Sequence, residues 1–240
     1  MTYRLGIDVG GTNTDAVILD QRDAVLAKCK TVTTEDVFTG INRAVESVLR
    51  DVSIHPSLIE DAMLGTTHAT NAIVERKGLA KVGVLRLAAP SGRAIPPFVD
   101  WPNDLLGSTA FASHIVSGGY EYDGALISDL DLEEVRRSLE SLQRMGAEAL
   151  AVSCAFSPVN DQQERRVQEL AAECFGPDFP VTLSSEIGSV GLIERENAAI
   201  LNAAIRSLAE RAYGSFEHVL QTHGIQADLF ITQNDGTLMS

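Results

Sequence analysis

A glycine-rich stretch near the N-terminus has the residue types of a phosphate-binding loop. Residues 6–15 read GIDVGGTNTD and lie between two β-rich runs. Glycine lets backbone N–H groups converge on phosphate oxygens without obstruction by a Cβ atom, and hydroxyl and amide side chains add donors. Asp8, at the end of a strand, can hold Mg²⁺, usually through water. The expected nucleotide ligands in this loop are Gly10, Gly11, Thr12, Asn13 and Thr14.

Two alternatives for this loop can be weighed from the sequence. The chain contains no GxxxxGK[ST] motif, and the loop joins a strand to a strand rather than to a helix, so it is not a Walker P-loop. A plain glycine-rich hairpin would account for the glycines but for neither the strand-end aspartate nor the cluster of hydroxyls. We therefore predict that this loop binds a nucleotide.

A second stretch, LGTTHATNAIVERKG at residues 64–78, is predicted to lead from a strand into a helix. Small hydrogen-bond donors at a helix N-terminus can bind a carboxylate or phosphoryl oxygen, so Thr66, Thr67 and Asn71 are candidate substrate ligands. The alternative is a structural junction in which Thr67 caps the helix and Asn71 is solvated. His68 could contact substrate or occupy the turn; a metal role is disfavoured because no second His or Cys lies nearby in the sequence.

Further candidates lie in the C-terminal part of the chain. Arg195 stands near the start of a predicted long helix, and its planar, permanently charged guanidinium suits a carboxylate or phosphoryl group. A surface salt bridge with Glu194 or Glu196 fits the same spacing. Asp235 and Gly236 belong to the run QNDGTL, directly after a predicted strand, although an Asn-Asp-Gly turn alone is uninformative.

The elements that must position these residues follow from the hydrophobic periodicity. Residues 4–9, 15–20 and 24–32 are β-rich and predict an antiparallel meander, and residues 36–52 carry apolar side chains at helical spacing. Strands and helices then alternate, which indicates an α/β fold. The remaining predicted elements are a strand at 62–66, a helix at 70–77, a strand at 81–88, a helix at 131–145, a strand at 148–156, a helix at 161–174, a strand at 181–185, a helix at 192–221 and a strand at 228–232.

Residues 89–128 interrupt this alternation. The stretch is rich in proline and contains the only tryptophan, so it is interpreted as a loop-rich insertion. After it, Asp131 is predicted to cap a helix, with Glu134 at the spacing of a capping box. Asn160 and Gln163 are expected to open the next helix in the same way.

The composition is that of a globular protein with a strong acidic charge. The 240 residues are 45% hydrophobic and carry a formal net charge of −14, which disfavours binding to nucleic acid or to an anionic membrane. A local anion site made of backbone N–H groups is still allowed. Cys29, Cys154 and Cys174 show no CxxC spacing, and the first two are predicted to be reduced core thiols. Without a signal peptide or an apolar run of about 20 residues, a cytoplasmic protein is expected.

The motifs resemble those of known ATP-dependent proteins. The first loop resembles the first phosphate loop of the superfamily of actin, heat-shock chaperones and sugar kinases, while residues 64–78 resemble the hydantoinase/oxoprolinase signature. Residues 184–188 with Arg195, and the run QNDGTL, are similar to later blocks of that family. The chain departs from the family pattern at Asn197 and Thr237, where a hydroxyl residue and a second glycine are usual.

The resemblance implies an α/β fold with a ribonuclease-H-like or actin-like nucleotide-binding half, a mixed sheet and an inserted α/β subdomain. It implies ATP and Mg²⁺ as cofactors, with Asp8 and Asp235 as catalytic residues on either side of the nucleotide and Gly236 in a second phosphate loop. The implied domains are a first phosphate-loop region at 1–88, the inserted α/β subdomain at 89–185, and a long helix with the start of a truncated second domain at 186–240.

The implied function is that of the N-terminal part of an ATP-dependent cyclic-amide hydrolase, of hydantoin or 5-oxoproline type, that phosphorylates the amide oxygen. The family also contains ketone carboxylases, so a ketone substrate stays open, and its members usually work with a partner subunit. Two other interpretations remain: a small-metabolite kinase, which residues 64–78 disfavour, and a non-catalytic nucleotide-binding or scaffold subunit. Because the chain stops at the second phosphate loop, we expect it not to turn over ATP alone; a complete small domain is the alternative.

Overall fold

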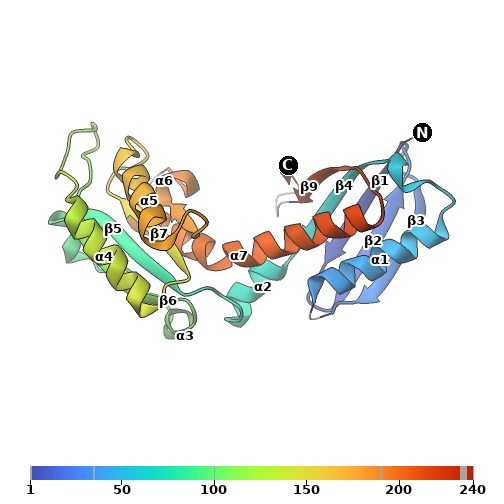
Figure 1. The fold of residues 1–240 in the computed structure, drawn as a ribbon, viewed down its shortest axis with the longest axis horizontal. Coiled ribbons are helices and arrows are strands. Elements are labelled where there is room, and N and C mark those ends of the chain that lie inside the picture. The colour runs from blue at the N-terminus through green and yellow to red at the C-terminus, as the bar shows by residue number, and fades with distance from the viewer. Residues whose placement is uncertain (1, 35, 100, 190, 233–236, 240) are drawn as a thin grey trace. The chain divides into compact units, whose positions relative to one another are not determined.

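The chain folds into two compact units. The computed structural model describes residues 2–34, 36–99, 101–189, 191–232 and 237–239. Unit 1 comprises residues 1–71 and 208–240, and unit 2 comprises residues 72–207 (Figure 1). The long helix α7 (Leu192–Thr222) supplies residues to both units. Within the described part of the chain, no helix has the length and hydropathy needed to span a membrane.

Unit 1 is built on a mixed sheet, sheet A, with the strand order β10-β9-β4-β1-β2-β3. The first three strands form an antiparallel meander, which confirms the prediction from the sequence. β4 is parallel to β1, β9 is parallel to β4, and β10 is antiparallel to β9. The strands are β1 (Tyr3–Val9), β2 (Asn13–Leu19), β3 (Val25–Val32), β4 (Ile59–Thr66), β9 (Asp228–Thr232) and β10 (Leu238–Met239), and a short helix η1 (Pro56–Leu58) precedes β4.

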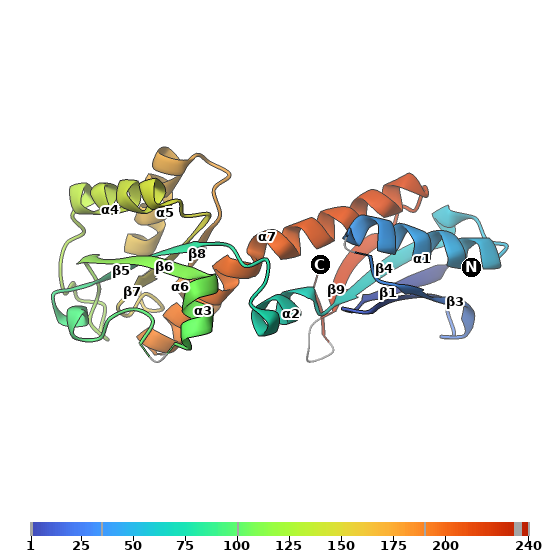
Figure 2. The same ribbon diagram turned by 90° about the horizontal axis from the view of Figure 1, so that it is seen from below.

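One face of sheet A is covered by helix α1 (Val37–Asp51) and by the C-terminal part of α7 (Figure 2). Asp36 caps α1 by accepting hydrogen bonds from two backbone N–H groups of its first turn. Because successive residues of a strand point to opposite faces, β1 sends one alternate set into this core and the other set, which includes Asp8, to the opposite face. The core is formed by Leu5, Ile7, Val9, Ala16, Ile18, Ile41, Val45, Val48, Leu64, Phe216 and Val219, among others.

Unit 2 contains a parallel sheet, sheet B, with the strand order β6-β5-β7-β8. Helices α4 and α5 pack on one face, and the N-terminal half of α7 packs on the other. With both faces covered, β5 is buried along its whole length. The elements are β5 (Val82–Ala89), β6 (Ala110–Ser117), β7 (Ala149–Cys154), β8 (Val181–Leu183), α2 (His68–Glu75, shared with unit 1), η2 (Ser91–Ala94), α3 (Asn103–Ser108), α4 (Leu132–Met145), α5 (Gln162–Phe175) and α6 (Ser184–Ile187).

The interpretation of residues 89–128 as loop-rich was wrong for the middle of that stretch. Residues 110–117 form strand β6, which pairs in parallel with β5, and α3 immediately precedes it. The run AFASHIVS shows neither a continuous apolar character nor a clear alternation, so its local pattern does not identify a strand. Pairing with the buried neighbour β5 supplies what the local sequence lacks.

Two predicted capping residues have other partners. Asp131 caps α4 as predicted, but the capping box was wrong, because Glu134 accepts a hydrogen bond from the backbone N–H of Ser117 at 2.9 Å. Gln163 does not open α5 either; its side-chain oxygen accepts from the backbone N–H of Gly119 at 2.7 Å. Glu134 therefore holds the last residue of β6, and Gln163 holds the segment that follows it.

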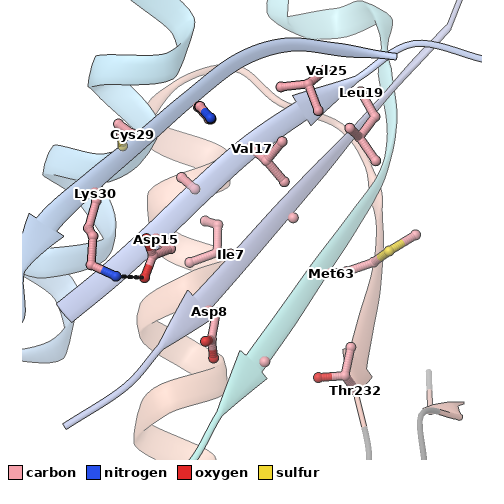
Figure 3. A pocket seen from close by; sticks show the side chains of 14 residues that line it. Ile7, Asp8, Asp15, Val17, Leu19, Val25, Cys29, Lys30, Met63 and Thr232 are labelled. Atoms are coloured by element: carbon pink, nitrogen blue, oxygen red, sulfur yellow. Dashed lines mark hydrogen bonds and ion pairs between the residues drawn. The ribbon is translucent and has the colours of Figure 1, made fainter. Parts of the chain in front are cut away.

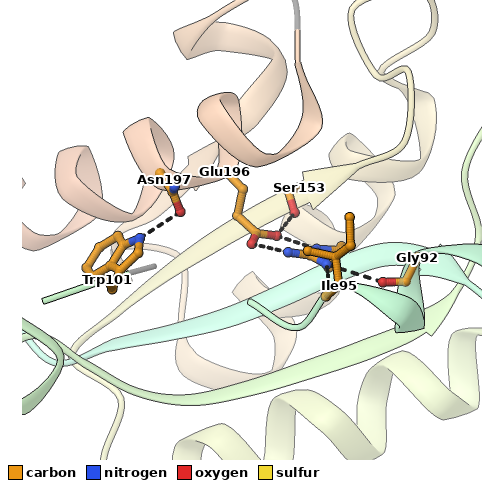
Figure 4. Close-up of polar contacts among 7 residues, drawn as sticks. Gly92, Ile95, Trp101, Ser153, Glu196 and Asn197 are labelled. Carbon is orange, nitrogen blue, oxygen red and sulfur yellow. Dashed lines mark hydrogen bonds and ion pairs between the residues drawn. The ribbon is translucent and has the colours of Figure 1, made fainter. Parts of the chain in front are cut away.

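A buried ion pair joins the centre of sheet B to α7. The side chains of Arg86 and Glu196 are both 1% exposed, and Arg86 donates to the two carboxylate oxygens at 2.7 and 2.5 Å. Ser153 of β7 donates to the same carboxylate at 2.6 Å, and Arg86 also donates to the carbonyls of Gly92 and Ile95 (Figure 4). Both charged groups are thus hydrogen-bonded, the condition under which a buried pair is tolerated.

Removing one member of this pair should destabilise unit 2. The substitution Glu196→Gln leaves the Arg86 charge buried without a counter-charge, and we expect a loss of about 3–5 kcal/mol in the free energy of unfolding. Urea unfolding followed by circular dichroism measures it. Glu140→Gln, at an exposed position of α4, is the matched control and should change stability by less than about 0.5 kcal/mol. Equal stability of the two variants would contradict the role given to the pair.

Candidate functional site

Thr33, the residue after β3, forms hydrogen bonds with the glycine-rich loop between β1 and β2. Gly10 N–H donates to the carbonyl of Asn13 at 2.9 Å, which closes the turn. Thr33 donates from its hydroxyl to the Gly10 carbonyl at 2.8 Å and from its backbone N–H to the Thr12 carbonyl at 2.9 Å. Gly11 and Thr12 are exposed at the tip of the loop. The loop therefore has a fixed backbone and an accessible outer surface.

The second sequence motif lies directly beside this loop. The hydroxyl of Thr66 donates to the Val9 carbonyl at 3.3 Å, and the backbone N–H of Thr67 donates to the same carbonyl at 3.4 Å. A Cβ atom on Gly11 would lie 3.2 Å from the amide nitrogen of Asn71, so glycine allows the loop to approach helix α2 closely. Two motifs more than 50 residues apart thus form one wall.

Strand register places a carboxylate at the same edge of sheet A. β1 and β4 are parallel, and Asp8 is the register partner of Gly65. A Cβ atom on Gly65 would lie 3.2 Å from the Asp8 carboxylate and 3.1 Å from the hydroxyl of Thr232, at the end of β9. Asp8 is exposed. The carboxyl ends of three parallel strands therefore meet around the Asp8 side chain.

An open cavity of about 790 Å³ extends from this edge across the face of sheet A that α1 leaves uncovered (Figure 3). Asp8 and Thr232 lie at one end of it, together with Gly65, the register partner of Asp8. The charged side chains of Asp15 and Lys30 form an ion pair at 3.3 Å on neighbouring strands. Lys28 and the apolar side chains of Val17, Leu19, Val25 and Met63 line much of the remainder.

The structure brings most of the predicted residues together but gives them different environments. In unit 1, Asp8, Gly10, Gly11, Thr12, Asn13, Thr66, Thr67 and Asn71 gather at this edge of sheet A. Thr14 belongs to the loop, but its side chain is 0% exposed and its hydroxyl contacts that of Thr33 at 3.1 Å, so it faces inward. Asp235 and Gly236 lie outside the described residues.

Thr66 and His68 are bonded to each other. The Thr66 hydroxyl accepts from the backbone N–H of His68 at 3.2 Å and contacts the ring Nδ1 of His68 at 3.1 Å. These bonds, with the one to Val9, engage the Thr66 hydroxyl in joining β1, β4 and α2. Thr67 is exposed, and its hydroxyl accepts from the side-chain amide of Asn71 at 3.3 Å. Of the three candidate ligands in this motif, Thr67 is therefore exposed and Asn71 is half-buried, while the hydroxyl of Thr66 is engaged by the fold.

Arg195 lies in unit 2 and is buried. It is 4% exposed, so a surface salt bridge with Glu194 or Glu196 is not its role. Its Nε donates to the Ser184 hydroxyl at 2.9 Å, and its Nη2 donates to the Cys154 carbonyl at 2.6 Å. Asn197, two residues further along α7, accepts from the indole N–H of Trp101 at 2.8 Å (Figure 4).

Sequence reasoning missed two side chains that shape the first loop and its edge. Thr33 was not singled out, although the predicted meander brings the end of β3 beside the loop, with Val32 opposite Asn13. Thr232 was counted only as the end of a strand. Its place beside Gly65 depends on the pairing of β4 with β9, strands separated by more than 160 residues, and no local signal indicates that pairing.

The described residues constrain the chemistry of metals and thiols. Among them, no group of three or more His, Cys, Asp or Glu side chains is placed to hold a metal ion. All three cysteines are free thiols. Burial raises the pKa of the Cys29 thiol, which also donates to the Ala44 carbonyl at 3.3 Å, and burial likewise raises the pKa of Cys154. Both thiols are protonated at neutral pH, in agreement with the prediction of core thiols.

The fold and the arrangement of this edge define a class of protein. A mixed sheet that begins with a β-meander and carries a glycine-rich loop, joined to a parallel α/β unit, is consistent with the actin-like nucleotide-binding fold. The chain belongs to the hydantoinase/oxoprolinase family, because the family model described as the hydantoinase/oxoprolinase N-terminal region matches residues 4–175.

Two solved structures share this fold. A nucleotide-free structure of acetone carboxylase matches with a TM-score of 0.79 and 22% identity, covering 100% of this chain and 37% of that chain. A structure of an ATP-dependent caprolactamase from Pseudomonas jessenii matches with a TM-score of 0.75 and 23% identity, covering 98% of this chain and 36% of that chain.

The matches to curated relatives also cover nearly the whole of this chain. The acetophenone carboxylase gamma subunit of Aromatoleum aromaticum is 28% identical, over 97% of this chain and 35% of its own length. The caprolactamase subunit alpha of Pseudomonas jessenii is 24% identical, over 98% of this chain and 36% of its own length. The chain thus spans little more than a third of the length of these relatives.

Loss of the Thr33 hydroxyl should loosen the glycine-rich loop. Thr33→Val removes the bond to the Gly10 carbonyl and leaves the buried Thr14 hydroxyl without one partner, so we expect a loss of about 1–3 kcal/mol in unfolding free energy. Amide hydrogen exchange should become faster at Gly10 to Asn13. Thr70→Val, at an exposed position of α2, is the control and should leave both quantities unchanged. Unaltered exchange at the loop in Thr33→Val would refute the supporting role of Thr33.

Proposed function

We propose that this chain is the nucleotide-binding part of an ATP-dependent enzyme that acts on a cyclic amide of hydantoin or 5-oxoproline type. One observation carries the proposal: the glycine-rich loop, Asp8 and the Thr67–Asn71 turn converge at a single edge of sheet A. Membership of the hydantoinase/oxoprolinase family supports it. A relative named caprolactamase subunit alpha, whose solved counterpart is described as ATP-dependent, supports both ATP and a cyclic amide.

The proposed reaction activates an unreactive amide by phosphorylation. The amide oxygen attacks the γ-phosphorus of ATP and ADP departs, which turns the carbonyl carbon into a better electrophile. Water then adds at that carbon and the ring C–N bond opens to leave an acyl phosphate, which a second water hydrolyses to the carboxylate and free phosphate. Phosphoryl transfer of this kind needs positioning and charge stabilisation more than an activated side-chain nucleophile, and the protonated thiols of Cys29 and Cys154 fit that requirement.

Each residue at the edge has a proposed role. Gly10, Gly11, Thr12 and Asn13 bind phosphate oxygens, and Thr67 with Asn71 contacts the substrate or the transferred phosphoryl group. Thr14 and Thr66 support these groups from within, since their hydroxyls are already bonded to neighbouring residues. We retain Asp235 and Gly236 as proposed members of the site, and Arg195 as a proposed substrate residue.

Mg²⁺ is part of this proposal, and the donors suit it. Mg²⁺ binds proteins through one or two carboxylates and completes its shell with water and phosphate oxygens. Asp8 is an exposed carboxylate at the edge, its register partner Asp15 is engaged in the ion pair with Lys30, and among the described residues no group of three or more ligating side chains is placed to hold a metal ion. Bound there, the ion would neutralise charge on the phosphates, while Asp8 fixes its place.

A ketone is the second candidate substrate class. The relatives include the acetophenone carboxylase gamma subunit and an acetone carboxylase beta subunit from Xanthobacter autotrophicus. The same nucleotide site would serve either chemistry. These names also support a partner subunit, because each relative is described as one subunit of an enzyme.

Removing the carboxylate of Asp8 should weaken binding of the magnesium nucleotide. We expect MgATP to shift the backbone amide resonances of Gly10, Gly11 and Thr12 in a titration followed by nuclear magnetic resonance. In Asp8→Asn the dissociation constant should rise roughly tenfold, equivalent to about 1.4 kcal/mol. Asp228→Asn, at the exposed opposite end of β9, is the control and should bind as the unaltered chain does. Equal affinities in the two variants would count against the proposed site.

A methyl group at position 65 should interfere with the same binding. In Gly65→Ala the new Cβ would crowd the Asp8 carboxylate and the Thr232 hydroxyl, at 3.2 and 3.1 Å, so we expect MgATP affinity to fall several-fold. Gly214→Ala makes the same chemical change on α7, where nothing lies within 4 Å, and should leave affinity unchanged. Isothermal titration calorimetry measures both. Undiminished affinity in Gly65→Ala would show that the Asp8–Gly65–Thr232 edge does not contact the nucleotide.

A further inference from the structure

A separate cavity of about 330 Å³ lies within unit 2, at the carboxyl end of β7. In sheet B the chain leaves the central strand β5 for β6 on one side and continues through β7 and β8 on the other. Ligands of parallel α/β sheets bind outside the carboxyl ends of the strands, where the chain changes direction in this way. The cavity wall is mostly apolar, with contributions from Ala155, Phe156, Pro158, Val159 and Leu192.

Arg195 supplies the one cationic side chain that lines this cavity among the described residues. Its hydrogen-bond acceptors among the described residues are uncharged: the Ser184 and Ser157 hydroxyls and the carbonyls of Cys154 and Gly191. Within the described part of the chain, the Nη1 atom contacts Gly191 at 3.4 Å, the longest distance of the set. Within the described residues, no carboxylate forms an ion pair with Arg195, unlike Arg86, which is paired with Glu196.

The carboxylate of Glu164 is connected to Arg195 through the hydroxyl of Ser184. Glu164 accepts from the hydroxyls of Ser184 and Ser185 at 2.6 and 2.7 Å, and Ser184 in turn accepts from Arg195. Burial lowers the pKa of Arg195, and the charge of Glu164 opposes that change. A buried charge without a direct counter-ion is unfavourable, and an anionic ligand at Nη1 would relieve it.

The mouth of the cavity carries exposed apolar side chains on a strained backbone. Phe156, immediately after β7, has φ = 52°, a conformation that bulky residues rarely adopt and that is often found at ligand sites. Phe156 is 46% exposed and Val159 is 55% exposed. A ligand with an apolar body would cover both side chains.

We propose that this cavity binds a small organic carboxylate, with its head group at Arg195 and its apolar body against Phe156, Val159 and Leu192. The volume lies at the lower end of the range for ligand pockets, about 300–1,000 Å³. A carboxylate fits better than a phosphate ester, because the single cationic side chain of Arg195 matches one negative charge, whereas a dianion would keep an unpaired charge in a mostly apolar cavity. Only the link between this cavity and the reaction rests on the proposed function, in which Arg195 is a substrate residue. The cavity then supplies that residue with a pocket and a class of ligand.

The test uses hexanoate and its uncharged counterpart hexanamide, without nucleotide. Titration of the 240-residue chain, followed by nuclear magnetic resonance, should give a hexanoate dissociation constant on the order of 1 mM, a typical weak affinity for a small ligand. Hexanamide should bind at least tenfold more weakly, because it lacks the charge that Arg195 recognises. Arg195→Gln should remove this discrimination between the two ligands.

Variants at the cavity mouth keep the proposal testable if Arg195→Gln fails to fold. Val159→Asp places a negative charge in the path of the carboxylate and should weaken hexanoate binding at least tenfold. Val74→Asp makes the same change at an exposed valine of α2 outside the cavity and should alter binding less than twofold. Equal affinities for hexanoate and hexanamide, or undiminished hexanoate binding in Val159→Asp, would overturn the proposal. Either failure leaves the Asp8 and MgATP results unaffected, so the two proposals can fail separately.

Discussion

The parallel pairing of β1 with β4 is the constraint on which the candidate nucleotide site depends. Its register sets Asp8 opposite Gly65 and Val9 opposite Thr66, so the two sequence motifs meet at one edge. A slip of one residue would turn Leu5 and its buried neighbours toward solvent and Asp8 into the core, because side chains alternate between faces. Burial of the apolar face therefore holds the carboxylate in position, and the core of unit 1 and its proposed chemistry are specified by the same residues.

Unit 2 is organised around a different kind of constraint. Its central strand β5 is buried on both faces, yet it carries Arg86, which is satisfied by Glu196 and by the carbonyls of Gly92 and Ile95. The pair fixes α7 against sheet B and holds the segment after β5. Arg195, next to Glu196 on α7, has no such partner among the described residues. This contrast with Arg86 on β5 distinguishes a structural arginine from a candidate ligand-binding one.

Much of the fold could be predicted because periodicity and local chemistry agreed. The meander, α1 and the Asp131 cap all follow from signals within a few residues. Features that depend on distant partners could not be predicted: β6 is a strand through its pairing with β5, and Glu134 turns away from its own helix toward Ser117. The same holds at the sites. The glycines of the first loop could be predicted from the sequence motif. The inward position of Thr14 and the burial of Arg195 could not, because they arise from tertiary packing.

Because the chain is acidic, binding of an anionic ligand requires short-range interactions rather than a favourable net charge. With a net charge of −14, long-range electrostatics would repel a nucleotide or a carboxylate, so any binding must come from short-range geometry. The proposed nucleotide edge relies on backbone N–H groups, neutral side chains and a Mg²⁺ ion at Asp8, and Lys30 beside it is already paired with Asp15. The cavity of unit 2 relies on a single buried guanidinium held by neutral acceptors. Burial shields the guanidinium of Arg195 from the surface charge, whereas the glycine-rich loop and Asp8 are exposed. Binding at Arg195 should therefore respond only weakly to ionic strength, while binding at the nucleotide edge should be screened by salt.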